Sequence, residues 1–315
     1  MACWLETWLS HKAGEVRVST LEGYRQIVQN HLLPTLGGER LDRLQPRHVD
    51  GLHKTLQAKG LSHRMVEYAH VLLHGALDYA VRLERLPRNV AALVKLPRKL
   101  ESKERLYWSI EEGTRFLQHL ERTNHRLYAF FYTALSTGMR RGELCGLRWS
   151  DLNPEGGSLR VGNAVIEVKG GKQFAEPKTP ASKRTVVLSS KTVKVLEAQK
   201  ARLEQEKEVL AGHPKLDKWI EEDLVFPNAR GRALDSSTLS HTFRKLCGEA
   251  GVRPIRIHDL RHTHASLLAF HGVPAKVISD RLGHTNVGFT LRVYTHLYDA
   301  QRKEGALELF GSSAC

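Results

Sequence analysis

Polar residues suited to phosphate chemistry occur at four places in the second half of the chain. The first is the stretch STGMRRGEL at residues 136–144, where Gly138 would end one helix and place Arg140 at the start of the next. An arginine in that position can bind a phosphate with two hydrogen bonds. Glu143, three residues later on the same helical face, could hold Arg140 in place. The alternative is a salt bridge at a helix end without a catalytic role.

The second place is a turn between two expected strands, with the sequence EPKTPASKR at residues 176–184. A lysine on such a turn, here Lys178, is usually only solvated. A turn that reaches into a minor groove could instead bring the lysine to a DNA strand, where its ammonium group could donate a proton. The turn therefore offers a candidate general acid.

The third place is IHDLRHTHA at residues 257–265. On a helix His258, Arg261 and His262 share one face, and the opposite face is apolar. An imidazole beside a guanidinium group suits phosphate binding. His258 and His262 also have the i,i+4 spacing of a metal site. However, the stretch is not HExxH, no third ligand is evident and Arg261 would repel a cation, so we expect no metal.

The fourth place combines LGHTN at residues 282–286 with TLRVYTH at residues 290–296. Gly283 would end a helix that begins near Pro274, and Asn286 could cap the next helix. His284, directly after the glycine, would then lie at a helix end.

Tyr294 would lie about two turns into that last helix. A lone tyrosine there is ordinarily a core or surface residue. It could also be a nucleophile, but its pKa of about 10 requires a base to accept the proton as it attacks. Tyr298 lies one turn later on nearly the same face, so spacing alone does not choose between the two tyrosines.

The overall composition indicates a soluble protein that binds a polyanion. The 315 residues carry a formal net charge of +14, and basic residues outnumber acidic ones both before and after Leu100. This balance favours nucleic acid as a partner, although solvated lysines can also produce it. No apolar run approaches the roughly 20 residues of a membrane span, and no signal peptide is evident. We therefore expect a cytoplasmic protein with no membrane partner.

The cysteines are scattered and form no CxxC pair. Neither a disulfide framework nor a zinc knuckle is indicated, so all four should be reduced thiols. They are Cys3, Cys145, Cys247 and Cys315.

Residues 1–95 should form an all-helical bundle. A capping box at Ser19–Glu22 predicts one helix start, Pro46 can begin a second helix that ends at Gly60, and Ser62 can cap a long third helix. Residues 96–107 are charged and broken by proline, which is typical of an extended linker and equally of a surface loop.

Residues 108–298 should form a second domain, mainly α with one small antiparallel β-sheet. A capping box at Ser109–Glu112 begins its first helix, and an apolar helix around Leu127–Leu135 follows. Short β-branched runs predict three strands, and the pattern is helical again from Ser189. The predicted strands are Leu159–Val161, Val165–Val168 and Thr185–Leu188.

Taken together and in this order, the four places resemble the tyrosine recombinase (phage integrase) family. TGMRRGEL is similar to the family's first arginine box and PKTPASKR to its β-turn lysine, while HDLRHTHAS and LGHTNVGFTLRVYTH are similar to its second box. The helical first domain resembles the core-binding domain. The PKT turn and the YTH ending are more similar to mobile-element integrases than to chromosome-resolving enzymes. Many such integrases carry a further arm-binding domain, which we expect to be absent or removed here because Trp4–Leu9 already opens the bundle.

The resemblance implies site-specific recombination through a 3′-phosphotyrosine at Tyr294, chosen over Tyr298 by the match to the VYTH box. His258 would be the base and Lys178 the acid that protonates the leaving oxygen. Glu143 and His262 would support the site. The bond energy is conserved in the phosphotyrosine, so neither a cofactor nor a metal is expected. The residues that would surround the phosphate are Arg140, Arg261 and His284.

The partners implied are double-stranded DNA and three further copies of the chain, which exchange strands through a four-way junction. Accessory DNA-bending proteins or an excision factor could take part. The tail at residues 299–315 would suit a helix that docks on a neighbouring protomer or caps its own domain. A type IB topoisomerase and a DNA-binding regulator that does not cleave are the alternative functions.

Overall fold

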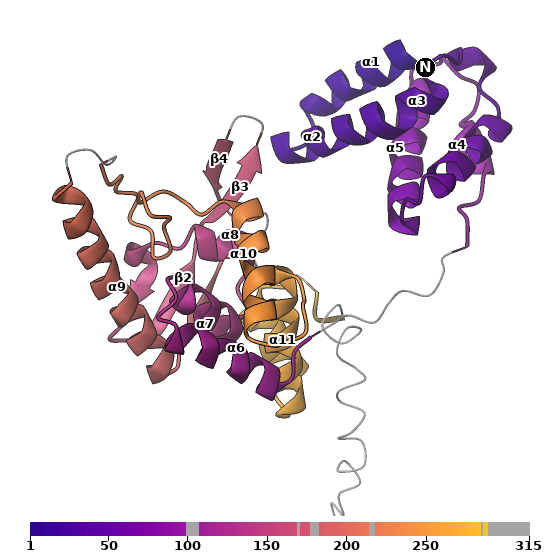
Figure 1. Cartoon of the computed structure of the whole chain (residues 1–315). Coiled ribbons are helices and arrows are strands. Elements are labelled where there is room, and N and C mark those ends of the chain that lie inside the picture. Colours follow the sequence, from indigo (N-terminus) through magenta and orange to yellow (C-terminus); the bar gives the residue numbers. More distant parts are fainter. Residues whose placement is uncertain (99–106, 169–170, 177–182, 214–217, 285, 289–315) are drawn as a thin grey trace, which may run out of the picture. The chain divides into compact units, whose positions relative to one another are not determined.

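The computed structural model describes residues 1–98, 107–168, 171–176, 183–213, 218–284 and 286–288. The chain divides into two compact units, Met1–Glu104 with Val168–Gly170, and Arg105–Glu167 with Gly171–Cys315. Each unit has a hydrophobic core of its own. Figure 1 labels the main helices and strands of both units. The expected linker at residues 96–107 lies largely outside the described residues.

The first unit is a helical bundle built around one long helix. That helix, α5, packs against α1, α4 and the π-helical turn η1. Its inward side chains and those of α4, such as Leu52 and Leu73, are fully buried. The elements of the bundle are α1 (Ala2–Ala13), α2 (Val18–Ile27), η1 (Val28–Leu32), α3 (Leu33–Leu36), η2 (Leu41–Arg43), α4 (Pro46–Ala58), α5 (His63–Arg82) and η3 (Val90–Leu93).

Two of the three helix starts predicted for this bundle are confirmed. Pro46 is the first residue of α4, and the Oγ atom of Ser62 accepts a hydrogen bond from the backbone N–H of Met65 at 3.3 Å, which caps α5. The capping box at Ser19 is wrong. Arg17 is extended and already supplies the first helical carbonyl, to the N–H of Leu21 at 3.0 Å, so Ser19 lies inside the first turn of α2.

Among its described residues the second unit is mainly helical with two small sheets, which confirms the predicted fold class. Its helices are α6 (Ile110–Arg122), α7 (Tyr128–Thr137), α8 (Arg141–Cys145), η4 (Trp149–Asp151), α9 (Ser190–Ala211), α10 (Ser236–Glu249), α11 (Ile257–Phe270) and α12 (Ala275–Leu282). Its strands are β1 (Leu152–Asn153), β2 (Ser158–Val161), β3 (Ala164–Val168), β4 (Gly171–Ala175) and β5 (Arg184–Val187).

The expectation of a single sheet is wrong. Strands β1, β2 and β5 form one antiparallel sheet, with Leu159 opposite Val186, and β3 and β4 form a separate pair. Strand β4 escaped prediction because its residues, GKQFA, are largely polar and exposed. The run at Val165–Val168 is a strand as predicted, but it pairs with β4.

Helix α7 lies at the centre of the second unit, where it packs against α6, α9 and α11. Phe131 of α7 packs on Phe116 and Phe243, with ring centroids 5.4 and 5.1 Å apart. Trp108 is fully buried beside them, and its Nε1 atom donates to the carbonyl of Arg253 at 2.7 Å. This aromatic cluster packs against the first turn of α7, and the first predicted site residues follow the other end of that helix. No helix among the described residues is long and apolar enough to cross a membrane.

Candidate active site

Two glycines in the left-handed conformation end the helices that form the site. Gly138 ends α7 with φ of 66°, and Gly283 ends α12 with φ of 68°, as predicted. Helix ends leave carbonyl oxygens without helical partners, and these carry partial negative charge. Such oxygens are suitable acceptors for guanidinium groups.

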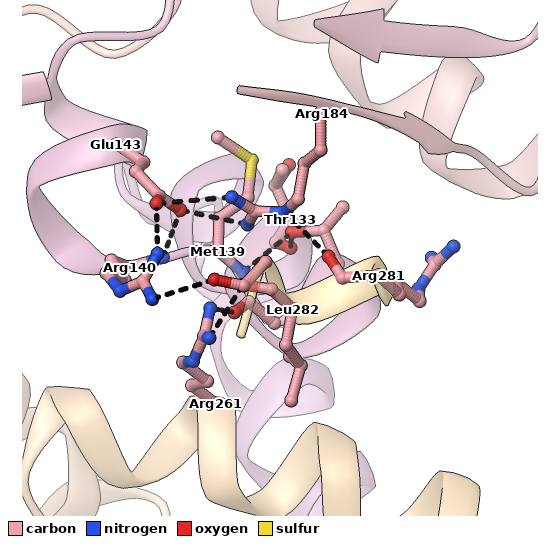
Figure 2. A network of polar contacts seen from close by, with 11 residues as sticks. Thr133, Met139, Arg140, Glu143, Arg184, Arg261, Arg281 and Leu282 are labelled. Carbon is pink, nitrogen blue, oxygen red and sulfur yellow. Dashed lines mark hydrogen bonds and ion pairs between the residues drawn. The ribbon is translucent and has the colours of Figure 1, made fainter. Parts of the chain in front are cut away.

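Both predicted phosphate-binding arginines use these carbonyl oxygens. Arg261, which is 4% exposed, donates from Nη1 to the carbonyl of Gly138 at 3.0 Å and from Nη2 to that of Leu282 at 2.7 Å. Arg140 donates from Nη2 to the carbonyl of Gly283 at 3.3 Å (Figure 2). The ends of α7 and α12 therefore orient Arg140, at the start of α8, and Arg261, in α11, as one cationic cluster.

Glu143 holds Arg140, as the sequence predicted. Arg140 is the N-cap residue of α8. Its backbone N–H donates to Oε2 of Glu143 at 2.8 Å and its Nη1 atom donates to Oε1 at 2.7 Å. The side chain of Glu143 is only 4% exposed, whereas that of Arg140 is 37% exposed. Arg140 is thus fixed at one end while part of it still faces solvent.

Arg184 is a second partner of the same carboxylate and was not predicted. It stands first in β5, with a side chain 6% exposed, and donates from Nη1 and Nη2 to Glu143 at 3.2 and 3.0 Å. Its Nε atom donates to the carbonyl of Arg281 at 2.7 Å. The alternation of side chains along β5 could have indicated that Arg184 points inward, because Arg184 shares the inward face of the strand with the buried Val186.

The carboxyl group of Glu143 is held in its charged form. Burial raises its pKa, but the hydrogen bonds and charges of Arg184 and Arg140 outweigh burial, and the pKa is lowered. One carboxylate is therefore shared by two guanidinium groups.

The face of α11 carries the remaining predicted residues of the third place. His258 is exposed and His262 half-buried, with ring centroids 5.4 Å apart and ring planes at 90°. Partial desolvation lowers the pKa of His258, and the positive charge of Arg261 lowers it further. Asp259 instead forms an ion pair with Arg256, whose Nη2 atom donates to Oδ1 of Asp259 at 2.7 Å. Within the described ranges no three histidine, cysteine or acidic residues are grouped as metal ligands.

His284 lies directly after Gly283 and faces the same charges. Burial lowers its pKa to about 3, with further contributions from Arg261 and Arg140. A phosphate would oppose the effect of those arginines, because a nearby negative charge favours the protonated ring.

Two further residues that were not predicted, His264 and Arg281, support the site. The buried His264 ring makes a 2.8 Å hydrogen bond from Nδ1 to the carbonyl of Leu135, and Arg281 donates from Nε to its Nε2 at 3.2 Å. Burial lowers the pKa of His264 to about 3, so the ring stays neutral. Arg281 also donates to the carbonyls of Val187 and Ser136, at 2.9 and 3.0 Å. Together the pair ties α7, α11, α12 and β5 to one another.

A depression of about 520 Å³ adjoins Arg140. It lies between α8, α10 and the start of α11, and basic side chains of all three helices line it. They are Arg140, Arg141, Arg244, Arg256 and His258. Positive charge in a concave surface attracts anions strongly.

The structure thus brings Arg140, Arg261 and His284 together and places His258 on the same helix as Arg261. Lys178 and Tyr294 lie outside the described residues, so their positions remain predictions.

The phage integrase family model matches residues 109–301, and the N-terminal SAM-like domain of phage integrases matches residues 2–57. The chain is 31% identical to the XerC-like tyrosine recombinase of Caldanaerobacter subterraneus, over 89% of this chain and 73% of that protein. It is 29% identical to the ICEBs1 integrase of Bacillus subtilis, over 91% and 76%.

Two solved structures share the fold. One is the Tn1549 transposon integrase in complex with transposon right end DNA, with a TM-score of 0.81 at 19% identity, covering 97% of this chain and 99% of that chain. The other is a lambda integrase tetramer bound to a Holliday junction, with a TM-score of 0.66 at 19% identity, covering 92% and 76%. From the family matches and the identity to its relatives, the chain belongs to the phage integrase family of tyrosine recombinases.

Proposed function

We propose that this enzyme, which breaks and rejoins DNA as its family does, is the site-specific integrase of a mobile element and attacks DNA with Tyr294. The observation that carries the proposal is the convergence of Arg140 and Arg261 at two helix ends beside His284. The relation to integrases of mobile elements supports the biological role. Residues 1–95 would bind the core site and residues 108–298 would carry the chemistry, joined by residues 96–107.

The arginine cluster would stabilise the transition state of phosphoryl transfer. Arg140 and Arg261 offer preorganised donors for the charge that grows on the non-bridging oxygens, and His284 would join them. Tyr294 attacks the phosphorus and forms a 3′-phosphotyrosine, and the bond to the 5′-oxygen breaks. The lowered pKa of His258 keeps it neutral near pH 7, which suits a base that accepts the tyrosine proton. Lys178 would protonate the 5′-oxygen.

The proposed partner is duplex DNA in the cytoplasm, bound largely through phosphate contacts, so its affinity should fall steeply with salt. We further propose four protomers on two DNA sites, with a Holliday junction as intermediate, by analogy with the lambda integrase assembly. DNA-bending proteins or an excision factor would direct the outcome.

A nicked suicide substrate tests the nucleophile. Tyr294→Phe should abolish the covalent protein–DNA adduct and leave DNA affinity unchanged, because only the phenolic oxygen is lost. Tyr298→Phe is the matched control and should form the adduct at the wild-type rate. An adduct that survives Tyr294→Phe contradicts the assignment, and the absence of any wild-type adduct would favour a non-cleaving regulator.

Strand exchange separates recombination from relaxation of supercoils. Two duplexes with different labels should yield a junction and then recombinant products. Relaxation of supercoiled DNA without a junction would favour a type IB topoisomerase instead.

A further inference from the structure

We propose that Arg184 is a positioning residue of the reaction, which offsets the charge of Glu143 so that Arg140 keeps its positive charge for the phosphate. The proposal rests on the assignment of Arg140 as a phosphate ligand. Arg184 would not touch DNA itself but would act through the shared carboxylate.

The geometry assigns the two guanidinium groups to the same buried carboxylate. Oε1 of Glu143 accepts from Nη1 of Arg140 at 2.7 Å and from Nη1 of Arg184 at 3.2 Å. Oε2 accepts from the backbone N–H of Arg140 and from Nη2 of Arg184. Figure 2 shows the carboxylate between the two arginines. The side chain of Arg184 is buried, whereas that of Arg140 remains partly exposed.

The charges explain why a second arginine is needed. Glu143 orients Arg140 by accepting two hydrogen bonds, but a buried carboxylate on its own would neutralise that guanidinium group. The trio of two arginines and one carboxylate carries a net charge of +1. Without Arg184 the remaining pair would be neutral and would attract a phosphate much less. With Arg184 in place, Arg140 is both oriented and positively charged.

Arg184 also links the carboxylate to the second helix end of the site. Its Nε atom donates to the carbonyl of Arg281, two residues before Gly283, whose own carbonyl accepts from Arg140. The guanidinium group of Arg140 therefore donates to two acceptors, Glu143 and the carbonyl of Gly283. Arg184 donates to the first of them and to a carbonyl two residues before the second. This link is an ordinary structural contact, and the test must separate it from the effect of charge.

A charge-restoring double variant makes that separation. Arg184→Gln should slow single-turnover cleavage of a suicide substrate by about tenfold, less than the hundredfold or more expected when a direct donor such as Arg140 is removed. DNA affinity should change little. The double variant Arg184→Gln with Glu143→Gln has a net charge of +1 again and should cleave faster than Arg184→Gln alone. A purely structural role of Arg184 predicts no rescue, because the second change removes a further contact.

The matched control is Arg160→Gln. Arg160 lies on β2, opposite Thr185 of β5, and its side chain is 75% exposed. This variant should cleave at the wild-type rate. Arg184→Lys keeps the charge without the two-armed contact and should cleave faster than Arg184→Gln. If Arg184→Gln does not fold, Arg184→Lys carries the test, and a loss as large as that of Arg140→Gln would overturn the proposal.

Arg140→Gln distinguishes failure of this proposal from failure of the proposed site. If Arg140→Gln cleaves normally, the assignment of the phosphate ligands is wrong. If Arg140→Gln is inactive while Arg184→Gln cleaves at the wild-type rate, or if the double variant is no faster than Arg184→Gln, only the role of Arg184 is refuted.

Discussion

Replacing Gly138 by alanine should damage both the stability and the chemistry of the second unit. The residue has φ of 66°, and a Cβ atom built on it would lie 2.6 Å from Cδ2 of His264 and 2.7 Å from Cδ2 of Leu282. Both neighbours are buried, at 6% and 0% exposure, so neither can swing into solvent.

Two separate penalties add up at this position. A non-glycine residue in the left-handed region loses about 1–2 kcal/mol of stability, and forcing a methyl group into a packed core costs about 1–3 kcal/mol more. Gly138→Ala should therefore lower the free energy of unfolding by roughly 2–5 kcal/mol. Gly157→Ala isolates the first penalty. Gly157 has φ of 55°, but its nearest atom to an added Cβ is the carbonyl oxygen of Leu188 at 3.7 Å.

Urea unfolding of the two variants measures the difference between their free energies of unfolding directly. The dependence of that free energy on urea concentration should be the same in both variants if the same unit unfolds. Under native conditions Gly138→Ala should also slow suicide-substrate cleavage, because the carbonyl of Gly138 accepts from Nη1 of Arg261 at 3.0 Å and must shift with the backbone. Gly157→Ala should cleave normally. Equal losses of stability in the two variants would refute the argument that packing against His264 and Leu282 requires glycine.

Two further predictions concern buried titratable groups. The rings of His53 and His70, joined by a 3.1 Å hydrogen bond, have pKa values lowered by burial, so the unfolded chain binds protons more readily. The bundle should therefore lose stability as pH falls below about 6.5. Peptide-resolved hydrogen exchange between pH 7.5 and 5, corrected for intrinsic exchange rates, would detect this loss. A stability of the bundle that does not depend on pH would contradict the prediction. Burial raises the pKa of the Cys145 and Cys247 thiols to about 11, whereas Cys3 is exposed, so peptide mapping after brief alkylation at neutral pH should find Cys3 modified before these two. Equal labelling of all three thiols would show that the core opens readily.

Features of the fold that depend on a few adjacent residues were predictable from the sequence. The starts at Pro46, Ser62 and Ser109 and the ends at Gly138 and Gly283 follow from local backbone chemistry, and the structure confirms each of them. Ser19 shows the limit of such patterns, because an extended residue just before it starts the helix earlier.

The supports of the site could not be predicted, because they join residues far apart in the chain. Arg184 reaches Glu143 across 41 positions, and Arg281 reaches His264 across 17 and Ser136 across 145. No spacing rule relates such residues, and only the packing of β5 and α12 beside α7 and α8 brings them together. The pairing of Arg140 with Glu143 was predictable for the opposite reason, because they lie only three positions apart at the start of one helix.

The kinds of acceptor around the two arginines suggest how the site can take up a phosphate. Arg261 donates to carbonyl oxygens, which orient a guanidinium group without cancelling its charge. Arg140 has one carbonyl acceptor and one carboxylate, and that carboxylate is shared with Arg184. Under the proposed function a phosphate would therefore bind a cluster that is already ordered and still positively charged. Preorganised donors of this kind stabilise a transition state without reorganising during the reaction, so under the proposed function the helix ends at Gly138 and Gly283 would contribute to catalysis as well as to the fold.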